Sequence, residues 1–520
     1  MLKLASLLSQ ILVTTSPVPK MDTASVDVTP ELLKSSHVYT LGALGILALL
    51  LLFSSTQNDP LSHVPGPWYA RWTDLPSKYY WVDGRKAPYI HDLHQKYGPI
   101  VRVGPREVYT ADPQIAKTVF RIKNEFPKSS WYLDFVPFTV TVFNTPDIHT
   151  HRRFRRLLSS PLSESGLKEF LPQIEHKVNL AIQGMAEEYK SRGAADIYKW
   201  WLFMTTDVIG ELSFGESFRM LESKKVSQYV KDLQSAGKVA SYRSAFPSIF
   251  RLSMRFGIRL PMISVAQKAA QRIRAYSLES LQRHKAIVAR EGPDSRPTVF
   301  SKVYKAEDDA SITHDEIRDN AQAYIIAGSD TTSNTLTYLA WAVCRHPEIK
   351  SRLLKELEVL PDDFDYEDLR VANLSYLEHV VDEALRRFPA APSGLPREVP
   401  KGGAELGGYH IPAGYTVTTQ NYSLHRDLHA FPDPEKFDPS RWENPTPAMK
   451  DAFMPFGGGS RICIGLHLAK IELRLGAARF FKTFPNATMS SLEGMTDEDM
   501  DPKLYFLINP RGHRCLMELE

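Results

Sequence analysis

The sequence predicts a mainly α-helical protein with small β-sheets, preceded by a single membrane-spanning helix. Helical patterns dominate from Pro113 onward, and strand-like segments are confined to short stretches near 100–110 and 407–419. No low-complexity tract or internal repeat interrupts residues 70–510. The length of 520 residues would allow several domains, but this continuity favours one large α-rich domain.

An uncharged apolar segment near the N-terminus predicts the membrane helix. Residues 38–55 and their neighbours form about 20 uncharged residues, which as a helix span about 30 Å and can cross a bilayer. A signal-peptide core or a buried helix would have the same hydropathy. No small-x-small cleavage site follows, so we expect a retained anchor over 38–55 and a proline-rich linker over 56–69. Residues 1–37 form an N-terminal extension, and Met21 is an alternative start.

The next elements follow from local patterns. Gly104-Pro105 separates two strand-like segments, and alternating apolar residues predict further strands within 407–419. The apolar spacing of several later segments predicts amphipathic helices. The strands are expected at Ile100–Val103 and Glu107–Thr110, and the helices at Lys168–Lys190, Asp207–Leu212 and Val226–Val239.

A long helix is expected to begin after Thr313, because Thr313 and Glu316 form a capping box, and to end near Arg345. Within it, Gly328 and the hydroxyl residues up to Thr332 are poor helix formers. A Thr hydroxyl there can hydrogen-bond to the carbonyl one turn earlier and open the helix. Taken alone, the segment would be a tolerated weak point in a buried helix.

Two charged motifs follow. Glu383 and Arg386 are three residues apart on a helix that ends before Pro389, so an ion pair is expected from spacing alone. Such pairs are common and contribute little when exposed. Residues 437–442, which include Arg441, form a second motif downstream, FDPSRW.

Cys463 lies in the glycine-rich run 456–465, FGGGSRICIG, just before a helix expected over Leu466–Phe480. Amide groups at a helix N-terminus favour a thiolate over a thiol. Glycines let the backbone approach a flat cofactor, and Arg461 can neutralise its acidic groups. The alternative is a buried free cysteine, the usual state of a lone Cys.

The run 456–465 resembles the haem-binding signature of the cytochrome P450 family. The matching positions are Phe456, Gly459, Arg461, Cys463 and Gly465. The segment 327–332 is similar to the A-G-x-D-T-T pattern of that family's oxygen-binding helix, and the E-x-x-R and FDPSRW motifs occur in the same order. The resemblance covers roughly residues 65–515. It implies the P450 fold and a haem-thiolate catalytic domain over 70–520.

By this resemblance, Cys463 is the axial ligand of the iron of haem b, as in the P450 enzymes. Asp330 and Thr331 are the implied catalytic residues, which relay protons and hydrogen-bond to dioxygen. Glu383, Arg386 and Arg441 form an implied buried network that fixes the cysteine loop. The cofactor-binding residues expected beside Cys463 are Arg461, Arg397, Arg155, His151, Phe456, Gly457, Gly459 and Gly465.

Two positions depart from the family pattern. His151 stands where members often have Trp, four residues before Arg155. The resemblance therefore supports a cofactor-binding role for His151 less strongly than for Arg155. Trp442 replaces a common phenylalanine. Apolar residues fill the segments where the family places its pocket loops, 131–138, 391–395 and 504–506. They suit a bulky hydrophobic substrate but would also suit an ordinary core.

The charge and the cysteine content exclude some classes of protein. A net charge of +3, without a dense basic block, argues against a nucleic-acid binder. Three cysteines far apart imply no disulfide framework and favour a reducing compartment.

We therefore expect a membrane-anchored haem-thiolate monooxygenase that uses O2 to hydroxylate, epoxidise or desaturate a hydrophobic small molecule. The chain has no flavin or nicotinamide fingerprint, so NADPH electrons would come from a separate NADPH–cytochrome P450 reductase, with cytochrome b5 as a further candidate donor. The resemblance implies a single-pass protein in the endoplasmic reticulum membrane, in contact with lipid, with a cytosolic catalytic domain. The residues of the FDPSRW and cysteine motifs are similar to those of filamentous-fungal members. Many of those members act on terpenoid, polyketide or alkaloid intermediates. The alternatives are a desaturase or ring-coupling enzyme without net oxygen insertion, and a non-catalytic haem-binding protein.

Overall fold

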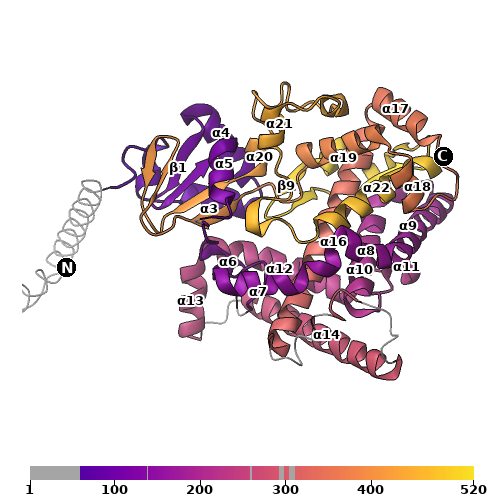
Figure 1. Ribbon diagram of the computed structural model, residues 1–520, viewed down its shortest axis with the longest axis horizontal. Helices are drawn as coiled ribbons and strands as arrows, with labels where there is room; N and C mark the ends of the chain where they lie inside the picture. The colour runs from indigo at the N-terminus through magenta and orange to yellow at the C-terminus, as the bar shows by residue number, and fades with distance from the viewer. Residues whose placement is uncertain are drawn as a thin grey trace, which may run out of the picture. The chain divides into compact units, whose positions relative to one another are not determined.

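Helix α16 (His314–Cys344) begins at the predicted capping box. The Thr313 hydroxyl accepts a hydrogen bond from the Glu316 amide, and the Glu316 carboxylate accepts one from the Thr313 amide at 2.9 Å. The helix ends shortly before Pro347, which begins the next helix. Helices from different parts of the chain pack against it, so α16 organises the helical part (Figure 1). They include α10 (Ile197–Phe214), α14 (Pro261–Glu291), α19 (Ser375–Arg387) and α22 (Leu466–Thr483).

The computed structural model describes residues 59–520 apart from 124, 138, 258–260, 292–297, 302 and 304–310. Residues Pro60–Glu520 form one compact unit. The predicted extension (1–37) and anchor (38–55) lie outside the described residues. None of the helices that are described is long and apolar enough to cross a bilayer.

The largest sheet joins strands that are distant in sequence. Its order is β1 (Ile100–Gly104), β2 (Glu107–Thr110), β7 (Thr416–Thr419) and β4 (Leu395–Glu398). β2 and β7 pair in parallel, with Val108 opposite Val417, and the other pairs are antiparallel. The expected strands near 100–110 and 407–419 are therefore confirmed. The sheet also places Arg397, on β4, opposite Val417.

The remaining elements confirm a mainly helical fold with small sheets. Two-stranded sheets form from β5 (Ala404–Leu406) with β6 (Tyr409–Ile411) and from β9 (Pro502–Leu504) with β10 (Ile508–Pro510). A three-stranded sheet combines β3 (Ala195–Asp196), β11 (Leu516–Glu518) and β8 (Thr488–Met489). The other helices include α3 (Leu75–Val82), α4 (Lys86–Tyr97), α5 (Pro113–Phe120), α6 (Trp131–Phe135), α7 (Ile148–Leu158), α9 (Leu171–Arg192), α12 (Gln228–Ala245), α13 (Pro247–Arg255), α17 (Pro347–Leu357), α18 (Tyr366–Val371), α20 (Asn421–Leu424) and α21 (Pro447–Ala452).

Three helix boundaries differ from those expected. α9 begins at Leu171 and not at Lys168, because Pro172 lacks an N–H and lies in the first turn. α12 begins after Ser227, whose hydroxyl accepts the Val230 amide. α10 is much longer than the expected 207–212. Its residues are buried on nearly all sides, so the sequence lacks the one-sided periodicity of a surface helix.

The hydrophobic core lies where α10, α16 and α22 meet. Trp201, Tyr338 and Phe480 are almost completely buried and belong to one continuous apolar cluster. Helix α22, which follows Cys463, is thus anchored in this apolar cluster.

Candidate functional site

Cys463 lies in the loop just before α22, as predicted. Its amide donates to the Phe456 carbonyl at 2.9 Å and closes the loop, and Gly465 is the N-cap of the helix. The side chain is exposed by accessible area. Surrounding protein atoms nevertheless raise the pKa of the thiol through burial, and the Gly465 amide and Arg155 oppose that shift. The sulfur is therefore accessible from one side and enclosed by protein atoms on the others. Such a sulfur can receive a flat group from one direction.

Gly459 fixes the path of this loop. Its φ of +64° favours glycine, and a Cβ atom there would lie 1.7 Å from the Phe120 carbonyl oxygen. Gly459 begins a 3-10 turn, Gly459–Arg461, that packs against α5. The glycine is therefore needed for close approach of two backbones. Gly457 also has a positive φ, of +71°.

Buried cations gather on one side of the loop. Arg461 Nε donates to Glu125 at 2.8 Å, and its Nη1 donates to the Thr145 carbonyl at 2.8 Å. Arg397 Nη1 donates to the Phe126 carbonyl at 3.0 Å. Lys128 is also buried, and burial together with Arg397 and Arg461 lowers its pKa well below the usual range. Glu125 is the carboxylate paired within this cluster.

Several polar atoms of the cluster lack a hydrogen-bond partner among the described residues. They include Arg397 Nε, His151 Nδ1 and Glu125 Oε2. Burial, followed by the nearby charge of Arg461, lowers the pKa of His151 to about 3, so its ring is neutral. Buried donors without acceptors, beside an excess of positive charge, are costly unless an anion binds them. The chemistry of the cluster therefore fits acidic groups.

Arg155 contacts the cysteine loop and not the cations around Arg461. Its Nη1 donates to the carbonyl of Ile462, the residue before Cys463, at 2.5 Å. Its charge also acts on the Cys463 sulfur. The structure thus brings His151 to the cation cluster and Arg155 to the cysteine, although both come from α7.

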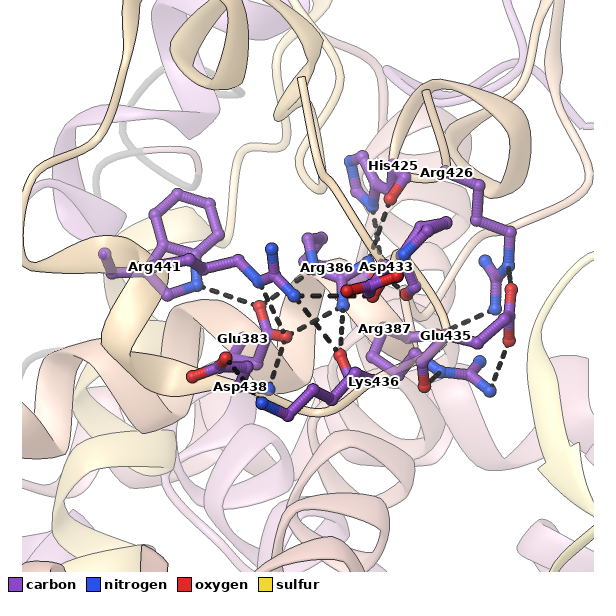
Figure 2. A network of polar contacts seen from close by, with 12 residues as sticks. Glu383, Arg386, Arg387, His425, Arg426, Asp433, Glu435, Lys436, Asp438 and Arg441 are labelled. Atoms are coloured by element: carbon purple, nitrogen blue, oxygen red, sulfur yellow. Dashed lines mark hydrogen bonds and ion pairs between the residues drawn. The ribbon is translucent and has the colours of Figure 1, made fainter. Parts of the chain in front are cut away.

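The predicted charge network is formed in full (Figure 2). Glu383 and Arg386 are completely buried and joined by two hydrogen bonds of 2.8 Å. Arg441 Nε lies 3.2 Å from the same carboxylate. Trp442 adds a hydrogen bond from its indole to Glu383 at 3.0 Å, which phenylalanine could not make. Arg386 also donates to the carbonyls of three further residues, namely His425, Pro434 and Lys436.

Asp330 and Thr331 lie on α16, which continues as a helix through 327–332. The expected back-bond is present, because the Thr331 hydroxyl donates to the Ala327 carbonyl at 2.7 Å. Burial raises the pKa of Asp330 to about 6. At Gly328 a Cβ would lie 2.8 Å from Ile209, so this position lets α16 approach α10 closely. Asp330 can therefore exchange a proton near neutral pH.

Residues 70–517 match the family model described as Cytochrome P450. The chain belongs to the cytochrome P450 family. It is 43% identical over 484 residues to cytochrome P450 monooxygenase tazI of Aspergillus terreus. The aligned region covers 91% of this chain and 98% of that protein. It is 41% identical to cytochrome P450 monooxygenase orf2 of Aspergillus niger, covering 92% and 97%. It is 30% identical to averantin hydroxylase of Dothistroma septosporum, covering 86% and 85%. The chain is accordingly a P450 monooxygenase, and the family implies haem, a redox partner and a small-molecule substrate.

The site residues fit a haem group. A P450 haem needs a thiolate for its iron and cations for its propionates. Cys463 supplies an accessible sulfur, and the unpaired donors of Arg397 and the cluster around Arg461 and Lys128 suit two carboxylates. Lys128 was not predicted from the sequence, because a lysine among aromatic residues gives no sign of its burial. Its Nζ lies 4.2 Å from the ring centroids of both Tyr132 and Phe143.

Glu472 is a second polar residue of this P450 that the sequence did not identify. It lies on the core face of α22, is 2% exposed, and has Thr332 of α16 close to its carboxyl group. Burial raises its pKa to about 8, so the carboxyl is neutral at physiological pH. The one signal in the sequence is an acid among the apolar positions of a buried helix face, such as Leu468 and Leu475.

The three expected pocket segments of the P450 domain come together. Phe506 lies 5.2 Å from Phe135 and 6.2 Å from Trp131, measured between ring centroids. The Ser393 hydroxyl donates to the Leu504 carbonyl at 3.1 Å and joins the other two segments. The result is an aromatic cluster of Trp131, Phe135 and Phe506, with segment 391–395 bonded beside it.

Proposed function

We propose that this cytochrome P450 hydroxylates a hydrophobic small molecule, using O2 and electrons delivered from NADPH by a separate reductase. The observation that carries the proposal is the accessible Cys463 sulfur, enclosed beside Arg155 and next to buried unpaired donors. We further propose that residues 70–520 form the haem-thiolate domain.

Each site residue has a proposed role. Cys463 binds the haem iron, Arg461, Arg397 and His151 face the propionates, and Arg155 stabilises the thiolate loop. Gly457, Gly459 and Gly465 shape that loop, and Phe456 covers it. A haem held by thiolate supplies dioxygen activation, and the thiolate favours O–O cleavage. Glu383, Arg386 and Arg441 hold the loop in place.

Asp330 and Thr331 are the proposed catalytic residues. O–O cleavage consumes protons, and Asp330, with a pKa raised to about 6, can hold and release one near neutral pH. Thr331 presents a hydroxyl that is already bonded to Ala327 and can turn to donate elsewhere. The two residues are adjacent on α16, and we propose that they deliver protons together.

The substrate class is argued from the pocket segments and from one relative. The aromatic cluster of Trp131, Phe135 and Phe506 suits a bulky apolar molecule. One relative is named averantin hydroxylase, and this name supports hydroxylation as the reaction. We propose a fungal terpenoid, polyketide or alkaloid intermediate as substrate.

An assay with isotopically labelled O2, NADPH and a purified reductase tests the reaction. We expect product that carries one labelled oxygen, and Cys463→Ala should lose both the thiolate-type spectrum and turnover. Product without label would replace hydroxylation with desaturation or ring coupling. A normal haem spectrum without any substrate-dependent NADPH use would favour a non-catalytic haem protein.

Membrane attachment is a further part of the proposal. We propose that residues 38–55 anchor the chain in the endoplasmic reticulum membrane, with the catalytic domain in the cytosol. Exposed aromatic and apolar residues near the start of the described chain and on α13 support contact with lipid, because Trp and Tyr favour the bilayer interface. They are Trp68, Trp72, Leu75, Tyr79, Ile249, Leu252, Met254 and Phe256. A chain that starts at residue 59 should leave the membrane fraction under alkaline extraction, whereas the full chain should remain.

Docking of the reductase is proposed at α7, next to the cysteine loop. Arg152 and Arg156 are exposed on that helix and suit an acidic partner. Electron transfer should slow as ionic strength rises, because salt screens exposed charges. Cytochrome b5 is a second proposed donor at the same face.

A further inference from the structure

His425 makes two hydrogen bonds that determine its protonation state. It is completely buried, Nδ1 lies 3.0 Å from the Arg386 carbonyl oxygen, and Nε2 lies 3.1 Å from the Met454 amide. A carbonyl can only accept and an amide N–H can only donate. Nδ1 must therefore carry the proton and Nε2 the lone pair, which makes the ring neutral. Burial, followed by the charge of Arg386, lowers the pKa of His425 to about 3 and agrees with this tautomer.

On one side, His425 is tied to the buried charge network. The Arg386 guanidinium donates to the His425 carbonyl at 2.9 Å, while the His425 ring donates to the Arg386 carbonyl (Figure 2). Each residue therefore binds the backbone of the other. Because Arg386 is held by Glu383, the position of the imidazole ring follows from the network.

On the other side, His425 is tied to the cysteine loop. Met454, which donates to the ring, also accepts the Gly457 amide at 2.9 Å. Two residues further on, Phe456 accepts the Cys463 amide at 2.9 Å. A continuous series of hydrogen bonds and short backbone segments thus leads from Arg386 through His425 and Met454 to Cys463. The His425 ring also contacts Phe453, with centroids 5.5 Å apart.

We propose that His425 is a positioning residue, which transmits the rigidity of the Glu383–Arg386 network to the Met454–Cys463 loop and so keeps Cys463 in place as a thiolate ligand. The role as a ligand rests on the proposed function, whereas the link between His425 and the loop does not. No part of the reaction passes through the ring itself. Its contribution is one neutral imidazole with a donor and an acceptor on opposite sides.

Two substitutions separate the two ends of the link. His425→Asn retains a donor near Nδ1, which can still reach Arg386, but has no acceptor for the Met454 amide. His425→Gln can place its side-chain oxygen near the former Nε2 and accept that amide. His346→Asn is a matched control, because His346 is half-buried and bonds the Ala342 carbonyl at 2.8 Å without contact to the loop.

The full-length chain is measured in two ways. The spectrum of the reduced CO complex gives the fraction of haem with a thiolate ligand, and hydrogen exchange reports on the Met454 and Cys463 amides. For His425→Asn we expect the ratio of thiolate-ligated to other haem to fall about three- to ten-fold, which corresponds to one lost hydrogen bond. Exchange at both amides should rise. His425→Gln and His346→Asn should remain close to the wild type.

Three results would overturn the proposal. The first is wild-type exchange and thiolate fraction in His425→Asn. The second is an equal loss in His425→Asn and His425→Gln, which would assign His425 to general packing. The third is faster exchange throughout the protein without preference for this loop. If the wild type itself gives no thiolate spectrum, the proposed function fails, and hydrogen exchange at Met454 and Cys463 still decides the role of His425.

Discussion

Two regions of the molecule differ in how their buried charges are compensated. Beside the cysteine loop, the Glu383 carboxylate is bonded to Arg386, Arg441 and Trp442. On the adjoining helices α16 and α22, burial is instead the main influence on Asp330 and Glu472, and it raises their pKa values to about 6 and about 8. The first region holds charges that are paired, and the second holds acids whose pKa values are raised toward neutral pH.

This difference in compensation distinguishes buried acids with a structural role from buried acids that can take part in chemistry. A buried carboxylate that is bonded to two guanidinium groups holds them in one arrangement, so it fixes geometry. An acid that is buried without a cation titrates near neutral pH and can gain or lose a proton. The same reasoning applies to the cation cluster around Arg461 and Lys128, where Arg397 Nε has no hydrogen-bond partner among the described residues and can bind an acidic group.

The largest effect is expected for Glu383→Gln. Loss of the carboxylate leaves the charges of Arg386 and Arg441 buried without compensation, so the free energy of unfolding should fall by about 3 to 5 kcal/mol. Thermal unfolding and haem content after purification measure the effect. Glu367→Gln is the control, because Glu367 forms an exposed pair with Arg370 and should change stability by about 0 to 1 kcal/mol. Equal losses in the two variants would contradict the comparison.

The next effect concerns pH. Glu472 has an ordinary pKa of 4.5 and a folded value of about 8. Between these values the folded protein holds a proton that the unfolded chain has released, so unfolding free energy falls as pH rises through the window. Each unit of pKa is worth about 1.4 kcal/mol, and the total is a few kcal/mol.

Glu472→Gln should remove this pH dependence, since an amide stays neutral. Denaturant unfolding at both ends of the window measures it. The variant should match the wild type near pH 4.5 and exceed it in stability near pH 8. An unchanged slope in the variant would show that another group is responsible.

Asp330→Asn should affect turnover rather than folding. The amide cannot release a proton, so the rate of product formation should fall about 100-fold, the lower range for loss of general acid–base catalysis. The haem spectrum should be unchanged. Asp315→Asn provides a control on the same helix, because Asp315 is exposed in its first turn. A parallel loss of haem would instead assign Asp330 to cofactor retention.

Much of this arrangement could be predicted from local sequence. The run 456–465, the capping box at Thr313 and the Glu383–Arg386 pair depend on residues that are close in the chain, and the structure forms the expected loop, helix and ion pair. Their chemistry is largely independent of the rest of the fold.

Other features depend on contacts between distant segments. Lys128 and Glu472 are ordinary charged residues in sequence, and their shifted pKa values arise because other elements cover them. The link through His425 joins α19 to the cysteine loop and has no local pattern. For α10, burial on all sides removed the periodicity by which a helix is recognised.

The smallest effect is expected for Trp442→Phe, which tests how complete the compensation of Glu383 must be. The substitution removes the 3.0 Å hydrogen bond from the indole but leaves the bonds from Arg386 to both carboxylate oxygens. The free energy of unfolding should fall by about 1 to 2 kcal/mol. Trp68→Phe, at a position 75% exposed, should have almost no effect.

The same substitution in the Glu383→Gln background completes a double-mutant cycle. If the indole acts through the carboxylate, the cost of Trp442→Phe should differ between the two backgrounds by about 0.5 kcal/mol or more. An identical cost in both would mean that Trp442 contributes through its packing on Phe453, whose ring centroid lies 4.6 Å away. In that case the two arginines alone compensate the buried carboxylate, and the family's more common phenylalanine at this position would be its energetic equivalent.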